Sequence, residues 1–336
     1  MVINMDLGEK SYPIIVEKGS LNKADSYFNL DRKVLIVTDS GVPAEYSDIV
    51  AAKCKNAFRF VFAEGEESKT FETFSAILAA LTENGFTRRD CVVAVGGGVA
   101  GDISGFAAAC YMRGIDFYNV PTTLLSQVDS SIGGKTAIDF LGYKNIVGAF
   151  HQPKAVLIDI NVLYSLDKRQ ISNGLAEVIK MAATSDENLF RLLENSDFKQ
   201  TAEEVIVKSL NIKKNVVEQD EKETGLRRVL NFGHTIAHAV ESTQIGNLYH
   251  GECVAIGMLP MCSGTVRERI SDLLKKYNLP TEIRGDIDTV CEALIHDKKS
   301  VENGVVTVYV DKIGSFEFRE MSYAELQEAV KEVFSK

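Results

Sequence analysis

The sequence predicts two domains: an α/β domain with a mostly parallel sheet over residues 1–160, and a mainly α-helical domain over residues 161–336. Short apolar runs alternate with helix-period segments in the first half, which is typical of a parallel sheet with helices on both faces. Long helical patterns dominate the second half. A chain of 336 residues is also too long for one small core and suits two domains.

The strands of the first domain are expected where buried apolar runs end in turn residues. These runs are Val34–Val37, Cys91–Val95, Asp116–Val120 and Ala155–Ile158. Helix-period apolar residues fill Phe71–Leu81, and an apolar helix is expected over Val99–Ala109.

In the second domain, helical spacing predicts four further helices, over Ile171–Ala183, Ala202–Val217, Asn231–Glu241 and Gly251–Gly264. Two β-rich runs, Val305–Val310 and Ser315–Arg319, flank Gly314 and predict a hairpin. A last helix is expected to begin after Ser322, because Glu325 completes a capping box.

Composition excludes several classes of function. The net charge of −10 disfavours broad nucleic-acid binding. No run approaches the roughly 20 apolar residues of a membrane helix, and residues 1–20 lack the pattern of a secretory signal. The six cysteines form no CxxC pair, which favours free thiols in a reducing compartment. We therefore expect a cytoplasmic protein that binds neither membrane nor nucleic acid.

A glycine-rich turn, Gly96–Gly98, follows the second predicted strand and opens the helix that carries Asp102. Glycine lets a backbone approach a phosphate closely, and a helix N-terminus offers free N–H groups to an anion. The spacing is not GxGxxG, so the usual dinucleotide fingerprint is absent. A tight turn without a ligand remains equally open, as does an ordinary N-terminal charge for Asp102.

The histidines could bind a metal, although two histidines at i,i+4 are more often a chance pair than a site. His234 and His238 are four apart on a predicted helix, and His250 follows in the next loop. A carboxylate from elsewhere could complete a divalent site, and Glu177 lies on an otherwise apolar helix face. The alternative for Glu177 is an ion pair with Lys180 at i,i+3.

Polar side chains at helical spacing extend this pattern over Arg227, Asn231, His234, His238 and Glu241. They form one stripe if the helix is continuous. A solvated face is the alternative, although such faces usually carry Glu and Lys.

Basic residues beside glycine-rich or apolar motifs could bind a phosphate and a carboxylate if they converge. Each taken singly is also compatible with a surface charge. They are Arg113, Lys135, Lys180, Lys213, Arg227, Lys298 and Lys299. Lys135 follows a glycine pair, but the spacing of a nucleoside-triphosphatase loop is not met.

Six blocks together resemble the 3-dehydroquinate synthase family of sugar phosphate cyclases, from about Val34 to Gly314. They are Gly96–Asp102, Pro121–Thr136, Lys144–Phe150, Leu175–Lys180, Leu230–His238 and His250–Glu252. The resemblance implies the fold of that family, with a nucleotide-binding domain followed by a domain for metal and substrate.

The resemblance also implies the cofactors and their residues. Zinc, or cobalt, would be held by Glu177, His234 and His250. The implied NAD site comprises Asp39, Glu66, Lys69, Gly97, Gly98, Val99, Asp102, Thr122, Thr123, Leu125, Asp129, Lys135, Lys144 and Ser165.

The implied substrate site takes a seven-carbon sugar phosphate acid. It comprises Asp129, Lys135, Asn145, Lys180, Lys213, Arg227, Asn231, His238, Lys298 and Lys299. Arg113 would reach the phosphate from the partner subunit of a homodimer. The implied reaction is transient oxidation by NAD, phosphate elimination, reduction and aldol cyclisation, with His238 shaping a proton path.

Three positions depart from the usual pattern of the family: Asp139 for Asn, Asp167 for Pro and Ala237 for Gly. The alternatives are another sugar phosphate cyclase, a metal-dependent NAD polyol dehydrogenase, and a non-catalytic nucleotide-binding protein. The dehydrogenase would release NADH and would not need so many basic residues. The non-catalytic protein would not need the metal set.

Overall fold

The structure is a computed structural model that describes residues 1–243, 247–296 and 304–335. The chain divides into two compact units, Met1–Leu166 and Asp167–Lys336. The sequence places the boundary near residue 160.

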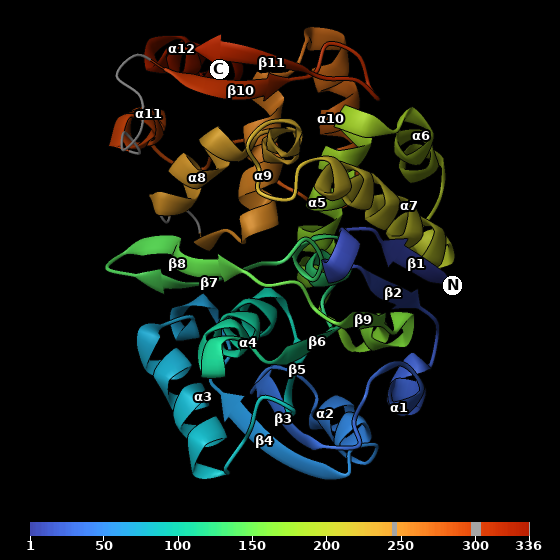
Figure 1. Ribbon diagram of the computed structural model, residues 1–336. Helices are drawn as coiled ribbons and strands as arrows, with labels where there is room; N and C mark the ends of the chain where they lie inside the picture. The colour runs from blue at the N-terminus through green and yellow to red at the C-terminus, as the bar shows by residue number, and fades with distance from the viewer. Residues whose placement is uncertain (244–246, 297–303, 336) are drawn as a thin grey trace. The chain divides into compact units, whose positions relative to one another are not determined.

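The first unit is built on a seven-stranded sheet with the order β1-β2-β9-β6-β5-β3-β4 (Figure 1). Its strands are β1 (Val2–Met5), β2 (Tyr12–Val16), β3 (Lys33–Asp39), β4 (Asn56–Phe62), β5 (Cys91–Gly96), β6 (Asp116–Pro121) and β9 (Ala155–Ile158). β1 pairs antiparallel with β2, and the other neighbours are parallel. The predicted mostly parallel sheet is confirmed.

Helices cover both faces of this sheet because successive side chains of a strand point to opposite sides. On β3, Val34 and Ile36 pack in the cluster that includes residues of α1 (Ala24–Tyr27) and α2 (Ala44–Ala51). Leu35 and Val37 pack in the opposite cluster, with α3 (Phe71–Glu83) and α4 (Gly98–Cys110). β3 and β5 are therefore almost continuously apolar, which is why the sequence reveals them.

A hairpin of β7 (Lys135–Phe140) and β8 (Tyr143–Phe150) forms a separate two-stranded sheet that the sequence did not predict. Its turn residues, Leu141 and Gly142, both have positive φ, of 50° and 81°. Two such residues are typical of a type I′ turn. The usual signal for this turn is Asn-Gly, and leucine in the first position conceals it.

The shorter segments of the first unit are η1 (Gly8–Lys10), η2 (Ser20–Lys23), η3 (Glu66–Ser68), η4 (Tyr111–Arg113), η5 (Ser126–Ser130) and η6 (Ile160–Ser165). η5 is a π-helical turn, and the others are single or double 3₁₀ turns.

The second unit is mainly helical. Its elements are α5 (Lys168–Ser185), α6 (Glu187–Asn195), α7 (Phe198–Gln219), η7 (Leu226–Asn231), α8 (His234–Ser242), α9 (His250–Met258), η9 (Leu259–Met261), α10 (Gly264–Lys276), α11 (Ile287–His296), the hairpin β10 (Val305–Tyr309) and β11 (Glu317–Met321), and α12 (Tyr323–Phe334). Aspartates 167, 186 and 197 cap the starts of α5, α6 and α7 through their side chains. The predicted hairpin and the capping box of Ser322 with Glu325 are confirmed.

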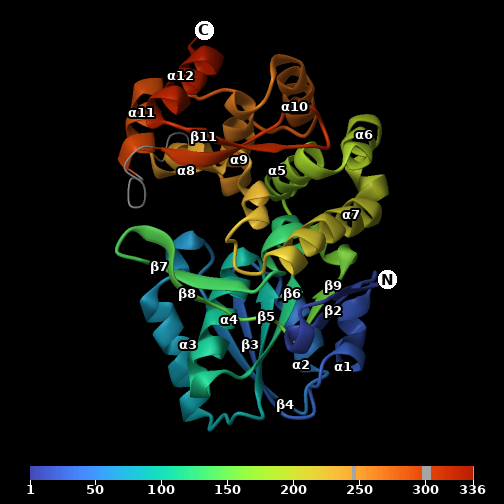
Figure 2. The ribbon, with the colours of Figure 1, turned by 45° about the horizontal axis from the view of Figure 1, so that its top comes forward.

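α9 is the central helix of this unit and packs against both α5 and α8 (Figure 2). Gly251 to Met258 are all buried. Gly257 permits this packing, since a Cβ there would lie 2.1 Å from the carbonyl oxygen of Gly233. The close approach therefore requires glycine.

Two predicted helices were wrong in their extent. Gly233 has a left-handed φ of 77°, so η7 ends at Asn231 and α8 begins at His234. The polar stripe from Arg227 to Glu241 is therefore interrupted. The helix predicted over Gly251–Gly264 ends at Met258, and α10 begins at Gly264. Pro260 lies between them and cannot continue the hydrogen-bonding of a helix.

Across the described ranges, no helix combines the length and the apolar character that crossing a bilayer demands.

Candidate functional site

In the first unit, the predicted nucleotide-binding residues meet at the carboxyl edge of three neighbouring strands. β3 ends at Asp39, β5 leads into Gly96 and Gly97, and β6 leads into Thr123. A Cβ on Gly96 would lie 3.3 Å from Asp39 Oδ2, and one on Gly97 would lie 3.1 Å from Thr123 Cγ2. Burial raises the pKa of Asp39. Ligands of open parallel sheets bind at this edge.

The N-terminus of α4 suits the phosphates of a dinucleotide. Its N-cap, Gly97, provides no side-chain hydrogen bond, and the helix is 13 residues long. The first N–H groups of such a helix lack intrahelical partners and form the positive end of the helix dipole. A Cβ on Gly98 would lie 3.2 Å from Ser130 Oγ, so the backbone here is close to a neighbouring side chain and leaves little room for a larger residue. The residues therefore fit NAD.

Beside this helix, three predicted residues form one network. Lys69 Nζ donates to Asp102 Oδ2 at 2.6 Å and to Asn145 Oδ1, and it lies 3.6 Å from Glu66 Oε1. Burial lowers the pKa of Lys69, but the carboxylates of Asp102 and Glu66 raise it more, and the net pKa is raised. Asp102 is therefore the partner of a buried lysine and more than an N-terminal charge.

Asp139 supports this network through the backbone. Its Oδ1 accepts the N–H of Asn145 at 2.8 Å, and Asn145 has a φ of 55°. Its own N–H donates to the carbonyl oxygen of Lys69 at 2.8 Å. An asparagine oxygen could accept the same bond, so the departure at this position keeps the local geometry.

The other predicted residues of the first unit lie on several elements. Arg113 ends η4 and is exposed, and both it and Met112 have positive φ, of 67° and 48°. Ser165 shares a hydrogen bond of 2.7 Å with the hydroxyl of Tyr46. Thr122, Val99, Leu125, Asp129, Lys135 and Lys144 lie between the end of β6 and β8, or on α4 in the case of Val99.

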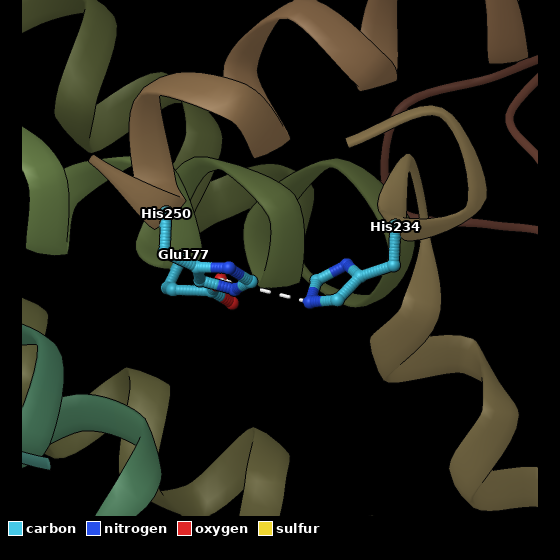
Figure 3. Close-up of side chains that lie close together, drawn as sticks. All are labelled: Glu177, His234 and His250. Carbon is cyan, nitrogen blue, oxygen red and sulfur yellow. Dashed lines mark ion pairs between the residues drawn. The ribbon is translucent and has the colours of Figure 1, made fainter. Parts of the chain in front are cut away.

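In the second unit, the three predicted metal ligands come together from three helices (Figure 3). Glu177 lies on α5, His234 begins α8 and His250 begins α9. One ligand atom from each lies within 4.8 Å of the other two. Glu177 is buried, with 1% of its surface exposed, so its carboxylate requires a compensating charge.

The two imidazoles are oriented as metal ligands are. His250 Nδ1 lies 3.4 Å from Glu241 Oε2, and His234 Nδ1 lies 3.3 Å from the carbonyl oxygen of Phe232. Their Nε2 atoms lie 3.5 Å and 3.8 Å from Glu177 Oε1. Ligand atoms on a tetrahedral zinc ion lie about 3.3–3.6 Å apart. The donor set and its spacing therefore fit a divalent metal, with both Nδ1 atoms anchored.

The ion-pair alternative for Glu177 is present in this structure, because Lys180 Nζ forms an ion pair with Oε2. The exposed fraction of Lys180 is 2%. The carboxylate thus has the Lys180 cation beside Oε2, while its other oxygen, Oε1, faces Nε2 of both histidines.

The pKa values reflect this crowding. Burial raises the pKa of Glu177, but Lys180 and both imidazoles lower it more, so the carboxyl stays ionised. Burial and the Lys180 charge hold the pKa of His234 well below its ordinary value. Burial lowers the pKa of His250, whereas hydrogen bonds to Glu177 and Glu241 raise it to about 9 overall. A metal ion would replace the proton that faces Glu177.

The predicted substrate residues of the second unit surround this cluster on neighbouring elements. The His238 ring is exposed, and its centroid lies 5.6 Å from that of His234 and 6.3 Å from that of His250. Lys213 on α7 and Arg227 on η7 are buried cations, and both elements pack against α5. Asn231 Nδ2 donates to Glu223 Oε1 at 2.7 Å. Lys298 and Lys299 lie outside the described residues.

Two residues that the sequence did not single out lie beside the metal ligands. Arg169 pairs with Glu252 next to His250, and Asn173 accepts the N–H of Gly251 at 2.6 Å. Both precede Glu177 on α5 at intervals of four, which is the signal that could have revealed them.

Comparisons with known proteins identify relatives along the whole chain. The family described as "3-dehydroquinate synthase N-terminal" matches residues 59–173, and the one described as "3-dehydroquinate synthase C-terminal" matches residues 174–300. A protein named 3-dehydroquinate synthase from Streptococcus thermophilus is 40% identical over 98% of this chain and 99% of its own length.

Solved structures share the fold. A 2-epi-5-epi-valiolone synthase from Streptomyces hygroscopicus, with NAD⁺ and Zn²⁺ bound, is 29% identical, with a TM-score of 0.87 over 98% of both chains. A 2-deoxy-scyllo-inosose synthase complexed with carbaglucose-6-phosphate, NAD⁺ and Co²⁺ is 24% identical, with a TM-score of 0.89 over 99% of this chain and 100% of that one.

Proposed function

Because this chain belongs to the 3-dehydroquinate synthase family, we propose that it converts 3-deoxy-arabino-heptulosonate 7-phosphate to 3-dehydroquinate and phosphate. NAD and a divalent metal, zinc or cobalt, would be its cofactors. The reaction belongs to the shikimate pathway of aromatic amino acid biosynthesis.

The observation that carries this proposal is the convergence of Glu177, His234 and His250 from three helices. A non-catalytic nucleotide-binding protein would have no need of a buried carboxylate facing two anchored imidazoles. The relative with NAD⁺ and Zn²⁺ bound adds support, since it is 29% identical over nearly the whole chain. Relatives named 3-dehydroquinate synthase at 40% identity favour that product over those of other cyclases.

When bound, the metal supplies Lewis acidity to a substrate hydroxyl and NAD supplies a reversible hydride acceptor. Glu177, His234 and His250 would hold the metal. The carboxyl edge around Asp39, Gly97 and the start of α4 would hold the dinucleotide.

The remaining task of the protein is to bind a substrate with a carboxylate and a phosphate. We assign this task to Lys180, Lys213 and Arg227, which are buried cations in the second unit. A buried guanidinium presents a rigid fork that matches either anion. Lys135, Asn145 and Asp129, which lie in the first unit, are also assigned to substrate binding. Orientation by these groups favours the closing aldol step over side reactions.

His238 is assigned to the proton path of the phosphate elimination. Its exposed ring lies beside those of the two histidine ligands, yet it is not a member of the ligand set. It can therefore hold or relay a proton while His234 and His250 are occupied.

We also propose a cytoplasmic homodimer in which Arg113 contacts the substrate phosphate of the partner subunit. The six cysteines are free thiols, as suits a reducing compartment. Arg113 is exposed and held in a left-handed conformation with Met112, a strained geometry that is often kept for a function. Analytical ultracentrifugation should give the mass of a dimer. Arg113→Ala should raise the KM for the sugar phosphate while the dimer stays intact.

The test of the activity is phosphate release from 3-deoxy-arabino-heptulosonate 7-phosphate with catalytic NAD, with and without a chelator. We expect release that requires NAD, is lost with the chelator and leaves no net NADH.

Two other results would redirect the proposal. Phosphate release only from sugar phosphates without a carboxylate would indicate another sugar phosphate cyclase. NADH accumulation from simple polyols, without phosphate release, would indicate a dehydrogenase, and the roles of Lys135 and Arg227 would then be wrong.

A further inference from the structure

One face of α5 carries Arg169, Asn173 and Glu177 at intervals of four residues. Side chains at this spacing lie above one another along a helix. Glu177 is a proposed metal ligand, and α9, which begins with the ligand His250, packs against α5. Arg169 and Asn173 therefore lie on the same helix face as one proposed ligand, Glu177, and contact residues next to another, His250.

Arg169 binds the start of α9 through the carboxylate of Glu252. Its Nε and Nη2 donate to the two oxygens of Glu252, each at 2.7 Å, and Nη2 also donates to the carbonyl oxygen of Asn247 at 2.7 Å. Its guanidinium carbon lies 4.1 Å from the ring centroid of Tyr249. A two-pronged guanidinium–carboxylate contact fixes orientation as well as distance.

Glu252 also contacts Tyr249, the residue before the proposed ligand His250. Its Oε2 accepts the N–H of Tyr249 at 2.7 Å, and its exposed fraction is 6%. The carboxylate thus closes the first turn of α9 while Arg169 holds it from outside.

Asn173 fixes the residue after the ligand. Its Oδ1 accepts the N–H of Gly251 at 2.6 Å. A Cβ on Gly251 would lie 2.1 Å from the carbonyl oxygen of Asn173, so the two backbones approach as only glycine permits. The backbone on both sides of His250 is therefore tied to α5.

We infer that Arg169 and Asn173 are positioning residues that set the register of His250 against Glu177, and that metal affinity depends on them. The inference rests on the proposed metal site. A ligand held in place before the ion arrives does not have to be ordered on binding. Removing a residue that orients a metal ligand typically weakens metal binding by about 10- to 100-fold.

The second unit offers a matched control in Arg269. It also donates through Nε and Nη2 to one carboxylate, that of Glu194, at 2.9 Å each, and its guanidinium carbon lies 5.0 Å from the ring centroid of Phe190. This pair joins α10 to α6, and neither helix carries a metal ligand. The two arginines differ chiefly in the position of their carboxylate partners: Glu252 lies two residues after the proposed ligand His250, whereas Glu194 lies on a helix without a proposed ligand.

The experiment compares the full-length parent with Arg169→Met, Arg169→Lys, Asn173→Ala and Arg269→Met. Each protein is stripped with a chelator, and Co²⁺ and Zn²⁺ are titrated in competition with a chromophoric chelator. We expect Arg169→Met and Asn173→Ala to weaken binding by about tenfold or more and to alter the visible spectrum of bound Co²⁺. Arg169→Lys should recover part of the affinity. Arg269→Met should bind as the parent does, although both methionine variants lower the melting temperature of the metal-free protein.

The outcomes separate the inference from the function on which it rests. If the parent binds Co²⁺ and Arg169→Met matches its affinity and spectrum, the positioning role is wrong while the metal site stands. If Arg269→Met weakens binding as much as Arg169→Met does, the effect is general loss of stability and the positioning role is again wrong. If the parent binds no metal, or His250→Ala binds as tightly as the parent, the proposed metal site fails and the inference fails with it.

Discussion

Replacing Lys180 by methionine should destabilise the metal-free protein strongly. Lys180 and Glu177 form an ion pair with exposed fractions of only 2% and 1%. Removing one member of such a buried pair strands the other charge and typically costs about 3–5 kcal/mol. Two imidazole nitrogens remain 3.5 Å and 3.8 Å from Glu177 Oε1 and offset part of this loss. We therefore expect the lower end, about 3 kcal/mol.

The assay is urea unfolding of the metal-free protein followed by circular dichroism, with thermal melting as a second measurement. For a domain of this size, a loss of about 3 kcal/mol corresponds to a fall of about 6–12 °C in melting temperature. The control is Lys208→Met on α7, which removes an exposed pair with Glu204 at 3.8 Å. That pair should contribute less than about 0.5 kcal/mol.

Adding Zn²⁺ supplies the decisive comparison. A bound divalent cation would compensate the carboxylate that Lys180→Met leaves alone, so the difference between variant and parent should shrink when the ion saturates both. The reasoning is refuted if Lys180→Met costs no more than Lys208→Met without metal. It is also refuted if Zn²⁺ stabilises the parent more than it stabilises Lys180→Met.

The remaining predictions concern the nucleotide edge, the central helix and acid stability. Gly98→Ala places a methyl group 3.2 Å from Ser130 Oγ and should weaken NADH binding by about tenfold, as measured by fluorescence, without changing Zn²⁺ affinity. Unchanged NADH affinity would contradict the assignment of the start of α4 to dinucleotide binding. Gly257→Ala brings a methyl group to 2.1 Å from the Gly233 carbonyl oxygen and should lower the free energy of unfolding in urea by about 3 kcal/mol or more. Gly264→Ala, where a Cβ would have nothing within 4 Å, should cause no such loss. Equal losses in the two variants would count against the close packing at Gly257. Backbone N–H donors lower the pKa of Asp220 to about 2, so its stabilising contribution is present above the ordinary aspartate pKa and is lost as the pH falls through about 2. The free energy of unfolding of Asp220→Asn should therefore fall less steeply between about pH 4 and pH 2, and a slope equal to that of the parent would exclude this role.

Local sequence was enough for the elements whose signals are local. The strand around Val34–Val37 is apolar on both faces because helices cover both sides of the sheet, and the resulting continuous apolar run is visible in the sequence. Ser322 and Glu325 predict the start of α12 because a capping box is complete within four consecutive residues. His234 and His238 share a face for the same reason, since both lie within one short helix.

Sequence patterns failed where a distant contact decides the conformation. Gly233 interrupts the predicted stripe because the start of α8 approaches the backbone of α9, with a Cβ on Gly233 only 2.7 Å from Met258 N. The turn at Leu141 and Gly142 is hidden because leucine rarely adopts a positive φ. Neither feature has a periodic signature.

The sequence by itself determined the chemical types at the site: a carboxylate on an apolar helix face, histidines four apart, and a glycine turn after a buried strand. Only the tertiary structure decided that Glu177 meets His234 and His250, because these residues come from three helices whose packing is set by close backbone contacts. It alone also placed Arg169 and Asn173 around His250, through hydrogen bonds that span 83 and 78 residues of the chain. Periodicity describes one element at a time, and the relation between elements depends on contacts that no local pattern records.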